Sequence, residues 1–211
     1  MFHKLTSIYA LKLDNNKFLF KLSVSSEQDF THFEVNKKMK WSVGGVLMEY
    51  WDLYDENRRK LKKIVTRGSI LNDNEFHLVV NVWIKNKNNE FLISRRAENK
   101  PHPLMWETTG GSVLLGEESV DAAVREAKEE LDIDLDKSKG NLIGSVKRYY
   151  KGCNDILDVW LFGSNVSLND IKLQKEEVCD CLWASREKIR ELYNKGEFDA
   201  NPYFNIVIGL E

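Results

Sequence analysis

Three carboxylates at helical spacing are the first feature of this sequence that could do chemistry. Glu126, Glu129 and Glu130 fall at positions i, i+3 and i+4, and this spacing places them on one face of a helix. Like charges at that spacing repel each other and weaken a helix. A hard divalent cation, which prefers oxygen ligands, would offset the repulsion. The spacing therefore predicts a site for Mg²⁺, with Mn²⁺ as the alternative.

The sequence around these glutamates predicts a loop followed by an amphipathic helix. The loop contains Gly110, Gly111 and Gly116, and glycine lets a backbone turn tightly and approach a ligand closely. After the loop, apolar residues recur with the period of a helix, as expected when one face of the helix packs on a core. This apolar stripe consists of Val120, Ala123, Val124, Ala127 and Leu131.

Together, the loop and the helix resemble the Nudix box. The pattern of the box is Gly, five residues, Glu, seven residues, Arg-Glu, an apolar residue, any residue, Glu-Glu, any residue, Gly and an apolar residue. Asp132 replaces the final glycine. Asp tolerates the left-handed backbone conformation that a residue following a helix commonly adopts, so we expect a slightly weakened helix end and an intact site. The matching residues are Gly111, Glu117, Arg125, Glu126, Ala127, Glu129, Glu130 and Ile133.

This resemblance implies a metal-dependent hydrolase that cleaves a diphosphate linkage. By the resemblance, Glu126 and Glu130 bind the metal ion directly, Glu129 binds it directly or through water, and the carbonyl of Gly111 joins them. Divalent cations neutralise phosphate oxygens and lower the pKa of a bound water. The resemblance also implies a structural role for two further box residues, Glu117 and Arg125, as an ion pair that fixes the loop against the helix.

The general base that accepts the proton of the attacking water has four candidates. Glu129 and Glu130 lie in the box itself. Glu176 and Glu177 lie in a later polar loop, and a carboxylate of such a loop is the base in several Nudix hydrolases. For these two loop residues an exposed position without a catalytic role is the ordinary alternative.

One arginine is a candidate for binding the substrate. Arg95 and Arg96 follow a strand pattern near the expected phosphate pocket. By its place in the motif, Arg96 is the one that we expect to clamp a phosphate bidentately. Alternation along a strand directs Arg95 to a different face.

Two other functions compete with the hydrolase. The segments before the box resemble the Nudix branch that includes isopentenyl-diphosphate isomerase, but that isomerase has a cysteine and a histidine where this sequence has Gly110 and Ser112. A catalytically silent binding module usually lacks box glutamates, and all of them are present here. We therefore expect a hydrolase of a nucleoside diphosphate derivative or a similar organic pyrophosphate.

The remaining patterns predict the elements that hold the box in place. Residues 76–84 form a continuous apolar, β-branched run, which predicts a buried central strand, and residues 90–96 predict its neighbour. Ser185 begins a helix that Gly196 ends, and a last short helix follows Pro202. Helices on opposite sides of a mixed sheet indicate an α/β (α+β) protein, and the resemblance specifies the Nudix α/β/α sandwich.

The chain is expected to divide into an N-terminal extension and a catalytic domain. Residues 1–47 form a small β-rich extension whose role the sequence does not indicate. Residues 48–211 form the Nudix domain, with the box at residues 111–133.

The start of the natural protein is a separate hypothesis. If the source is bacterial, the codons for Gly44, Gly45 and Val46 can form a purine-rich ribosome-binding sequence shortly before Met48. Met48 would then be the true or an alternative start. Use of the two glycines in a turn is the alternative.

The bulk composition limits the partners. Apolar residues make up 42% of the chain, charged residues 30%, and the net charge is −2. Such a charge gives no general attraction to nucleic acid polymers or anionic membranes, so neither is expected as a partner. The odd set of Cys153, Cys179 and Cys181 indicates reduced thiols and a cytoplasmic protein. We expect a small diphosphate substrate, and a homodimer is compatible with the sequence.

Overall fold

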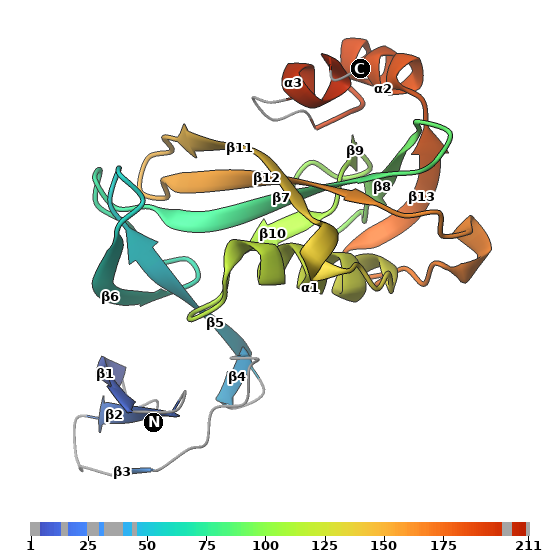
Figure 1. Cartoon of the computed structure of the whole chain (residues 1–211). Coiled ribbons are helices and arrows are strands. Elements are labelled where there is room, and N and C mark those ends of the chain that lie inside the picture. Colours follow the sequence, from blue (N-terminus) through green and yellow to red (C-terminus); the bar gives the residue numbers. More distant parts are fainter. Residues whose placement is uncertain are drawn as a thin grey trace. The chain divides into compact units, whose positions relative to one another are not determined.

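A computed structural model describes residues 5–13, 17–24, 30–31, 40–43, 46–199 and 204–209 (Figure 1). The chain divides into two compact units, Met1–Glu49 and Tyr50–Glu211. Strand β5 (Val46–Tyr54) runs across this boundary, and we retain a domain start at Met48 as a proposal. Within the described ranges, no helix has the length and apolar character needed to cross a membrane.

The first unit consists of strands in its described parts. β1 (Leu5–Leu13) pairs antiparallel with β2 (Lys17–Val24), which also pairs with β3 (Phe30–Thr31). β4 (Lys40–Val43) pairs antiparallel with the start of β5. This unit is β-rich, as predicted. Gly44 and Gly45, on which the start-site hypothesis depends, lie outside the described residues.

The second unit is built on one mixed sheet. β7 and β12 run parallel in the middle of the sheet, and their neighbours pair antiparallel (Figure 1). The order of strands is β11 (Asn141–Arg148), β12 (Asp155–Gly163), β7 (His77–Lys85), β8 (Phe91–Arg96) and β13 (Val178–Ala184), with β10 (Gly110–Ser112) beside β7 and β9 (Trp106–Glu107) beside β8.

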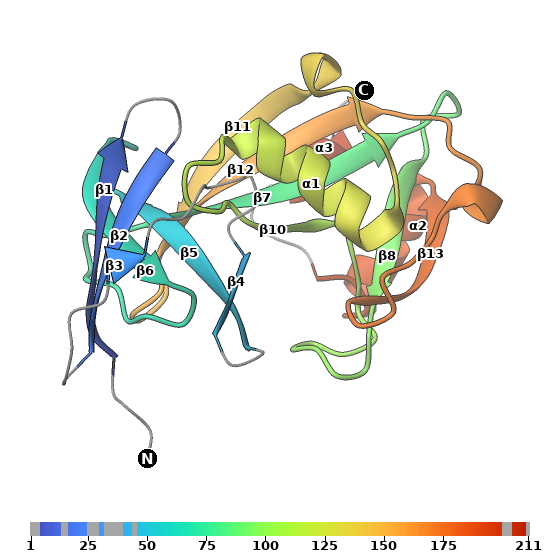
Figure 2. The same ribbon diagram turned by 90° about the horizontal axis from the view of Figure 1, so that it is seen from below.

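Helices cover both faces of this sheet. α1 lies along one face, and α2 and α3 lie on the other (Figure 1; Figure 2). This arrangement confirms the predicted α/β/α sandwich with a mixed sheet. The helices are α1 (Ser119–Leu131), α2 (Arg186–Asn194) and α3 (Phe204–Gly209), with short 3₁₀ helices η1 (Lys137–Lys139) and η2 (Leu168–Asp170).

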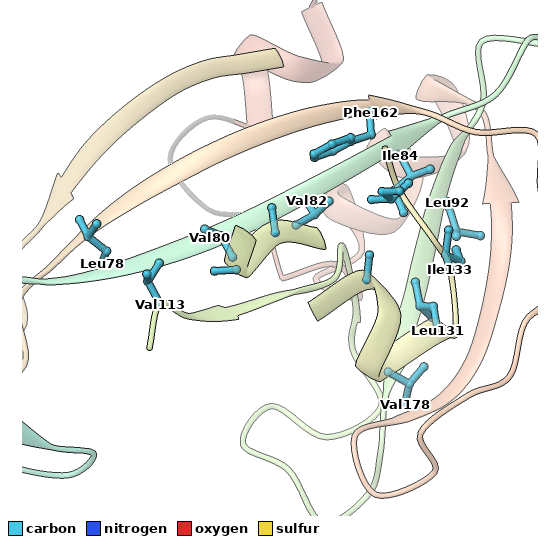
Figure 3. Close-up of a cluster of buried hydrophobic side chains, with 14 of the residues drawn as sticks. Leu78, Val80, Val82, Ile84, Leu92, Val113, Leu131, Ile133, Phe162 and Val178 are labelled. Atoms are coloured by element: carbon cyan, nitrogen blue, oxygen red, sulfur yellow. The ribbon is translucent and has the colours of Figure 1, made fainter. Parts of the chain in front are cut away.

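Strand β7 contributes to the cores on both sides of the sheet. Val80 and Val82 pack in the core under α1, whereas Trp83 packs in the core under α2 and α3. Figure 3 shows the core under α1, where Leu131 from the end of the helix lies near Val178 of β13. Burial on both faces explains why this strand is a continuous apolar run in the sequence. It also fixes α1, with its glutamates, on the sheet.

A hairpin of β5 and β6 (Lys60–Thr66) precedes the main sheet. Tyr54 and Phe76 exchange backbone hydrogen bonds of 2.8 and 2.9 Å. Arg58, in the turn of the hairpin, forms a two-pronged ion pair with Asp158 of β12, and Ser145 of β11 donates to the same carboxylate. The turn is thereby attached to the centre of the sheet.

Candidate active site

Arg125 joins the loop before α1 to the helix itself. Its Nε and Nη2 donate to the two carboxylate oxygens of Glu117 at 2.8 and 3.0 Å, and Nη2 also donates to the carbonyl of Ser112 at 3.0 Å. Its Nη1 lies 2.6 Å from Glu126 and 3.4 Å from Glu129. The Arg125 side chain is only 9% exposed, and burial strengthens such pairs relative to water. Glu117 and Arg125 therefore form the kind of ion pair that the family resemblance implies.

Gly111 lies directly against the carboxylate of Glu126. A Cβ atom at position 111 would overlap that carboxylate, so a side chain at this point of β10 would displace the end of Glu126. Burial raises the pKa of Glu126, and the charge of Arg125 opposes this effect. Two of the residues predicted to bind metal are thus neighbours.

Glu130 lies one turn further along α1, beside the segment between β9 and β10. The hydroxyl of Thr109 donates a hydrogen bond to Oε2 of Glu130. Burial raises the pKa of Glu130 to about 8, and the negative charge of Glu126 adds to the effect. A carboxylate that is buried beside another carboxylate is stabilised by any cation placed between them.

The donor set fits a hard divalent cation in its chemistry, but these side chains have other partners in this structure. Glu126 is paired with Arg125, and Glu130 is hydrogen-bonded to Thr109. Among residues 46–199 and the other described ranges, no three His, Cys, Asp or Glu side chains converge as a metal site requires. Binding a cation would therefore require the carboxylates of Glu126, Glu129 and Glu130 to turn toward it.

Arg96, the predicted phosphate clamp, is engaged by protein groups. Its Nη1 lies 2.7 Å from both carboxylate oxygens of Glu107, and its Nε donates to the carbonyl of Pro101 at 2.6 Å. Burial raises the pKa of Glu107. A phosphate would have to compete with Glu107 for this guanidinium, so substrate binding by Arg96 stays a prediction.

The loop before β13 is attached to the end of α1 through backbone groups. The amide of Lys172 donates to the carbonyl of Leu131 at 3.3 Å, and the amide of Gln174 donates to the carbonyl of Glu130 at 2.9 Å. These bonds satisfy carbonyls that a helix end leaves without partners. Asp132 follows in the predicted left-handed conformation, with φ of 56°.

The two loop candidates for the general base, Glu176 and Glu177, differ in their surroundings. Glu177 lies close enough to Glu130 for its charge to contribute to the raised pKa of Glu130. Glu177 also pairs with Lys100 of the loop between β8 and β9. Glu176 is exposed. The amide of Glu177 also donates to the carbonyl of Gln174 at 2.8 Å, so the backbone of Glu177 is held near the end of α1.

The β5–β6 hairpin accepts hydrogen bonds from the loop of the Nudix box. The amide of Gly116, which has a φ of 76°, donates to Oδ2 of Asp52 at 2.8 Å, and the amide of Leu115 donates to the carbonyl of Tyr50 at 2.8 Å. Asp52 is buried and also pairs with Lys60 at 2.6 Å. The loop is therefore held on one side by Arg125 and on the other by β5.

Sequence reasoning did not identify four residues that surround the site. Thr109 and Glu107 belong to the WETTGG segment that leads into the box, and this adjacency is the signal that could have indicated them. Lys100 and Asp52 carry no such signal, because only the fold brings their loops to the box.

Comparison with known proteins identifies the family. The model of the NUDIX domain matches residues 75–205. An uncharacterised Nudix hydrolase of Listeria innocua is 40% identical over 159 residues, which cover 74% of this chain and 90% of that protein. This chain belongs to the Nudix family and is a hydrolase enzyme. Family and fold support a pyrophosphohydrolase that acts on small molecules.

Solved structures share the fold. DR0079 of Deinococcus radiodurans aligns with a TM-score of 0.61 at 21% identity and covers 75% of this chain and 97% of that one. A MutT protein of Methanosarcina mazei aligns with a TM-score of 0.51 at 30% identity and covers 64% of this chain and 91% of that one. The α/β/α sandwich is therefore the Nudix fold, as predicted.

Gly110 provides a geometric argument against the isomerase. A Cβ atom at position 110 would overlap the backbone carbonyl oxygen of Val80 on the neighbouring strand β7. A cysteine, which the isomerase has at this position, would not fit without a shift of β10 away from β7. The backbone around Gly110 in this protein therefore has no room for the side chain of a cysteine.

Proposed function

We propose that this protein hydrolyses the diphosphate linkage of a nucleoside diphosphate derivative or a similar small organic pyrophosphate, with Mg²⁺ or Mn²⁺ as cofactor. The observation that carries this proposal is the pair of half-buried carboxylates, Glu126 and Glu130, on one face of α1, with Glu126 directly against the backbone of Gly111. Two half-buried, mutually repelling carboxylates suit a hard cation, and such a cation suits diphosphate oxygens. A cytoplasmic location is part of the same proposal.

The residues that would hold the metal are Glu126, Glu130, Glu129 and the carbonyl of Gly111. When bound, the metal would neutralise phosphate oxygens and lower the pKa of a bound water. Arg125 would orient Glu126, since it contacts that carboxylate at 2.6 Å. The hydroxyl of Thr109 would orient Glu130 in the same way.

Glu177 is the general base that we favour, and Glu129 and Glu130 are the alternatives within the box. Glu177 is near Glu130 but belongs to a different element, so it can accept a proton while the helix carboxylates hold the cation. In the reaction, the water oxygen forms a bond to phosphorus and the bridging P–O bond breaks. The electron pair of that bond leaves on the bridging oxygen, and the proton of the water passes to Glu177.

A substrate panel tests the function. It would contain nucleoside diphosphates and triphosphates, nucleotide sugars, dinucleotides and isopentenyl diphosphate, incubated with Mg²⁺ or with EDTA and analysed by chromatography. We expect cleavage of at least one compound with Mg²⁺ and none with EDTA. Glu130→Gln should lower turnover by about 10²–10³-fold, the loss typical of a major electrostatic group.

The matched control is Glu191→Gln, which changes an exposed glutamate of α2 whose ion-pair partners, among the residues that the structure describes, are Lys188 and Lys195. Its turnover should equal that of the wild type. Silence of the wild type across the panel would contradict the hydrolase and favour a binding module. Formation of dimethylallyl diphosphate would instead establish the isomerase.

A further inference from the structure

The loop between β8 and β9 carries a lysine that is paired with the proposed base. The ammonium of Lys100 contacts Oε2 of Glu177, and the two side chains are 22% and 34% exposed. The amide of Ala97 donates to the carbonyl of Glu177 at 2.9 Å. The pair therefore lies between two loops whose backbones are already joined, and it is not needed to bring them together.

Lys100 differs from the two arginines of the site in the donors that it keeps for a ligand. Arg125 is surrounded by glutamates, and Arg96 is engaged by Glu107 and Pro101. Glu177 is the ion-pair partner of Lys100 among the described residues. An ammonium group has three donors on a flexible stem, so it can bind a second anion by rotating the side chain.

The surroundings of Lys100 are strongly acidic. The positive charge of Lys100 acts on Glu107, and the negative charges of Glu107 and Glu177 both act on Glu130. Lys100 thus lies at the edge of the same carboxylate cluster as α1. A diphosphate bound at α1 would bring at least two further negative charges into reach of this ammonium.

The loop backbone is fixed, so only the lysine side chain has to move. The carbonyl of Pro101 accepts a hydrogen bond from Arg96, and the amide of Leu104 donates to the carbonyl of Arg96 at 3.2 Å. The amide of Lys100 itself donates to the carbonyl of Ala97 at 3.2 Å. Lys100 is half-buried, and rotation of such a surface side chain about its own bonds is fast compared with turnover.

We propose that Lys100 binds a phosphate of the substrate and, by doing so, releases Glu177. In the free protein, the ammonium of Lys100 is paired with an oxygen of the Glu177 carboxylate. When the diphosphate is bound, the ammonium pairs with a phosphate oxygen, and the carboxylate is free to accept the proton of the attacking water. The part that concerns Glu177 rests on the proposed function, whereas binding of a diphosphate by Lys100 does not.

A binding measurement tests Lys100 without turnover. The probe is methylenediphosphonate with Mg²⁺, titrated by calorimetry into the full-length protein. Lys100→Gln should weaken binding by about 10-fold or more, because a hydrogen bond to a charged group is lost. Lys100→Arg should retain most of the affinity. Lys195→Gln is the matched control, since it breaks another lysine–glutamate pair, with Glu191 in α2, and should bind as the wild type does.

Kinetics on a compound that the wild type cleaves test the release of Glu177. Lys100→Gln should raise KM about 10-fold and change kcat by less than about threefold, whereas Glu177→Gln should lower kcat by at least about 100-fold. In the Glu177→Gln background, Lys100→Gln should still raise KM, because the phosphate contact is lost in both backgrounds. A lysine that only held the loop through Glu177 would have no effect there.

The outcomes are distinguishable from failure of the proposed function. Equal affinity of wild type and Lys100→Gln for the probe would overturn the phosphate contact. A wild-type kcat in Glu177→Gln would overturn the release of Glu177. If the wild type cleaves nothing in the panel, the proposed function fails, while the calorimetric result still decides whether Lys100 binds a diphosphate.

Discussion

The amide of Gly116 donates a 2.8 Å hydrogen bond to the carboxylate of Asp52, 64 residues earlier in the chain. Gly116 lies in the loop of the Nudix box, and Asp52 lies on β5, before the region that matches the family model, residues 75–205. The bond makes the hairpin of β5 and β6 a support for the site. The hairpin is therefore part of the catalytic unit and not an appendage to it.

Removing this support should impair the enzyme. Asp52→Ala leaves the Gly116 amide without its acceptor and should lower kcat/KM by about 10- to 100-fold, as expected when reacting groups lose alignment. The free energy of unfolding should fall by roughly 1.5–3 kcal/mol, the contribution of a hydrogen bond to a charged group. Turnover and urea denaturation measure the two effects. Lys60→Gln keeps the Gly116 bond and serves as the control; equal activity of Asp52→Ala and wild type would contradict the role of Asp52.

Thr109 should matter through its hydroxyl. Thr109→Val preserves the shape of the side chain but removes the donor to Glu130, so kcat/KM should fall by about 10-fold, in line with the net contribution of one hydrogen bond to a charged group. Thr109→Ser keeps the donor and should behave like the wild type. The comparison uses the same substrate and Mg²⁺ concentration for all three proteins. Equal losses of kcat/KM in Thr109→Val and Thr109→Ser would indicate that the packing of the side chain, and not its hydroxyl, maintains activity.

The ion pair of Arg58 and Asp158 should be more important for stability than for chemistry. The Asp158 side chain is completely buried, so Arg58→Ala leaves a buried carboxylate without its cation and should cost about 3 kcal/mol in unfolding free energy. Replacing both partners, as Arg58→Met with Asp158→Leu, should cost less than Arg58→Ala alone. Urea denaturation of the single and double variants measures the difference. A double variant less stable than Arg58→Ala would contradict this account.

His77 should make stability depend on pH in acid. Its ring stacks on Trp51 with centroids 4.0 Å apart, and burial lowers its pKa from 6.5 to about 4. Between these two values the unfolded chain binds a proton at this position and the folded chain does not, so protons favour unfolding. The wild type should therefore lose up to about 3 kcal/mol of stability as the pH falls through this window.

His77→Phe provides the matched comparison, because phenylalanine keeps an aromatic ring on Trp51 and has no titrating group. The difference in unfolding free energy between wild type and variant should be constant above pH 7.5 and should change in favour of the variant as the pH falls. Denaturant titrations at a series of pH values measure this difference. If the unfolding free energies of the two proteins changed with pH in parallel, the pKa of His77 would be the same in the folded and the unfolded chain, and the prediction would be wrong.

The sequence was sufficient for those parts of the site that lie within one element. The spacing of Glu126, Glu129 and Glu130 defines one helix face, and the apolar stripe through Ala123 and Ala127 defines a second, adjacent face that is buried in the core. Both follow from helical periodicity, which is a local property. The central strand could also be predicted, because its continuous apolar run is likewise a local property of the sequence.

The parts that the sequence did not predict depend on contacts between distant segments. Asp52 is an ordinary strand residue until β5 is placed beside Gly116. Glu107 lies on a strand of two residues, which has no periodicity to detect. Arg96 was expected to face the substrate, but its partner Glu107 could be identified only from the pairing of β8 with β9.

The loop that carries Glu177 is anchored to α1 by main-chain amides, those of Lys172 and Gln174. Every residue except proline has such an amide, so the anchor is independent of the side chains at these positions. Changes of side chain along this loop could thus alter which molecule is accepted without displacing Glu177, the proposed base. Proline is the exception, because it has no amide hydrogen. A proline at position 172 or 174 would remove one of these hydrogen bonds and detach the loop from the helix, while every carboxylate of the box remained in place.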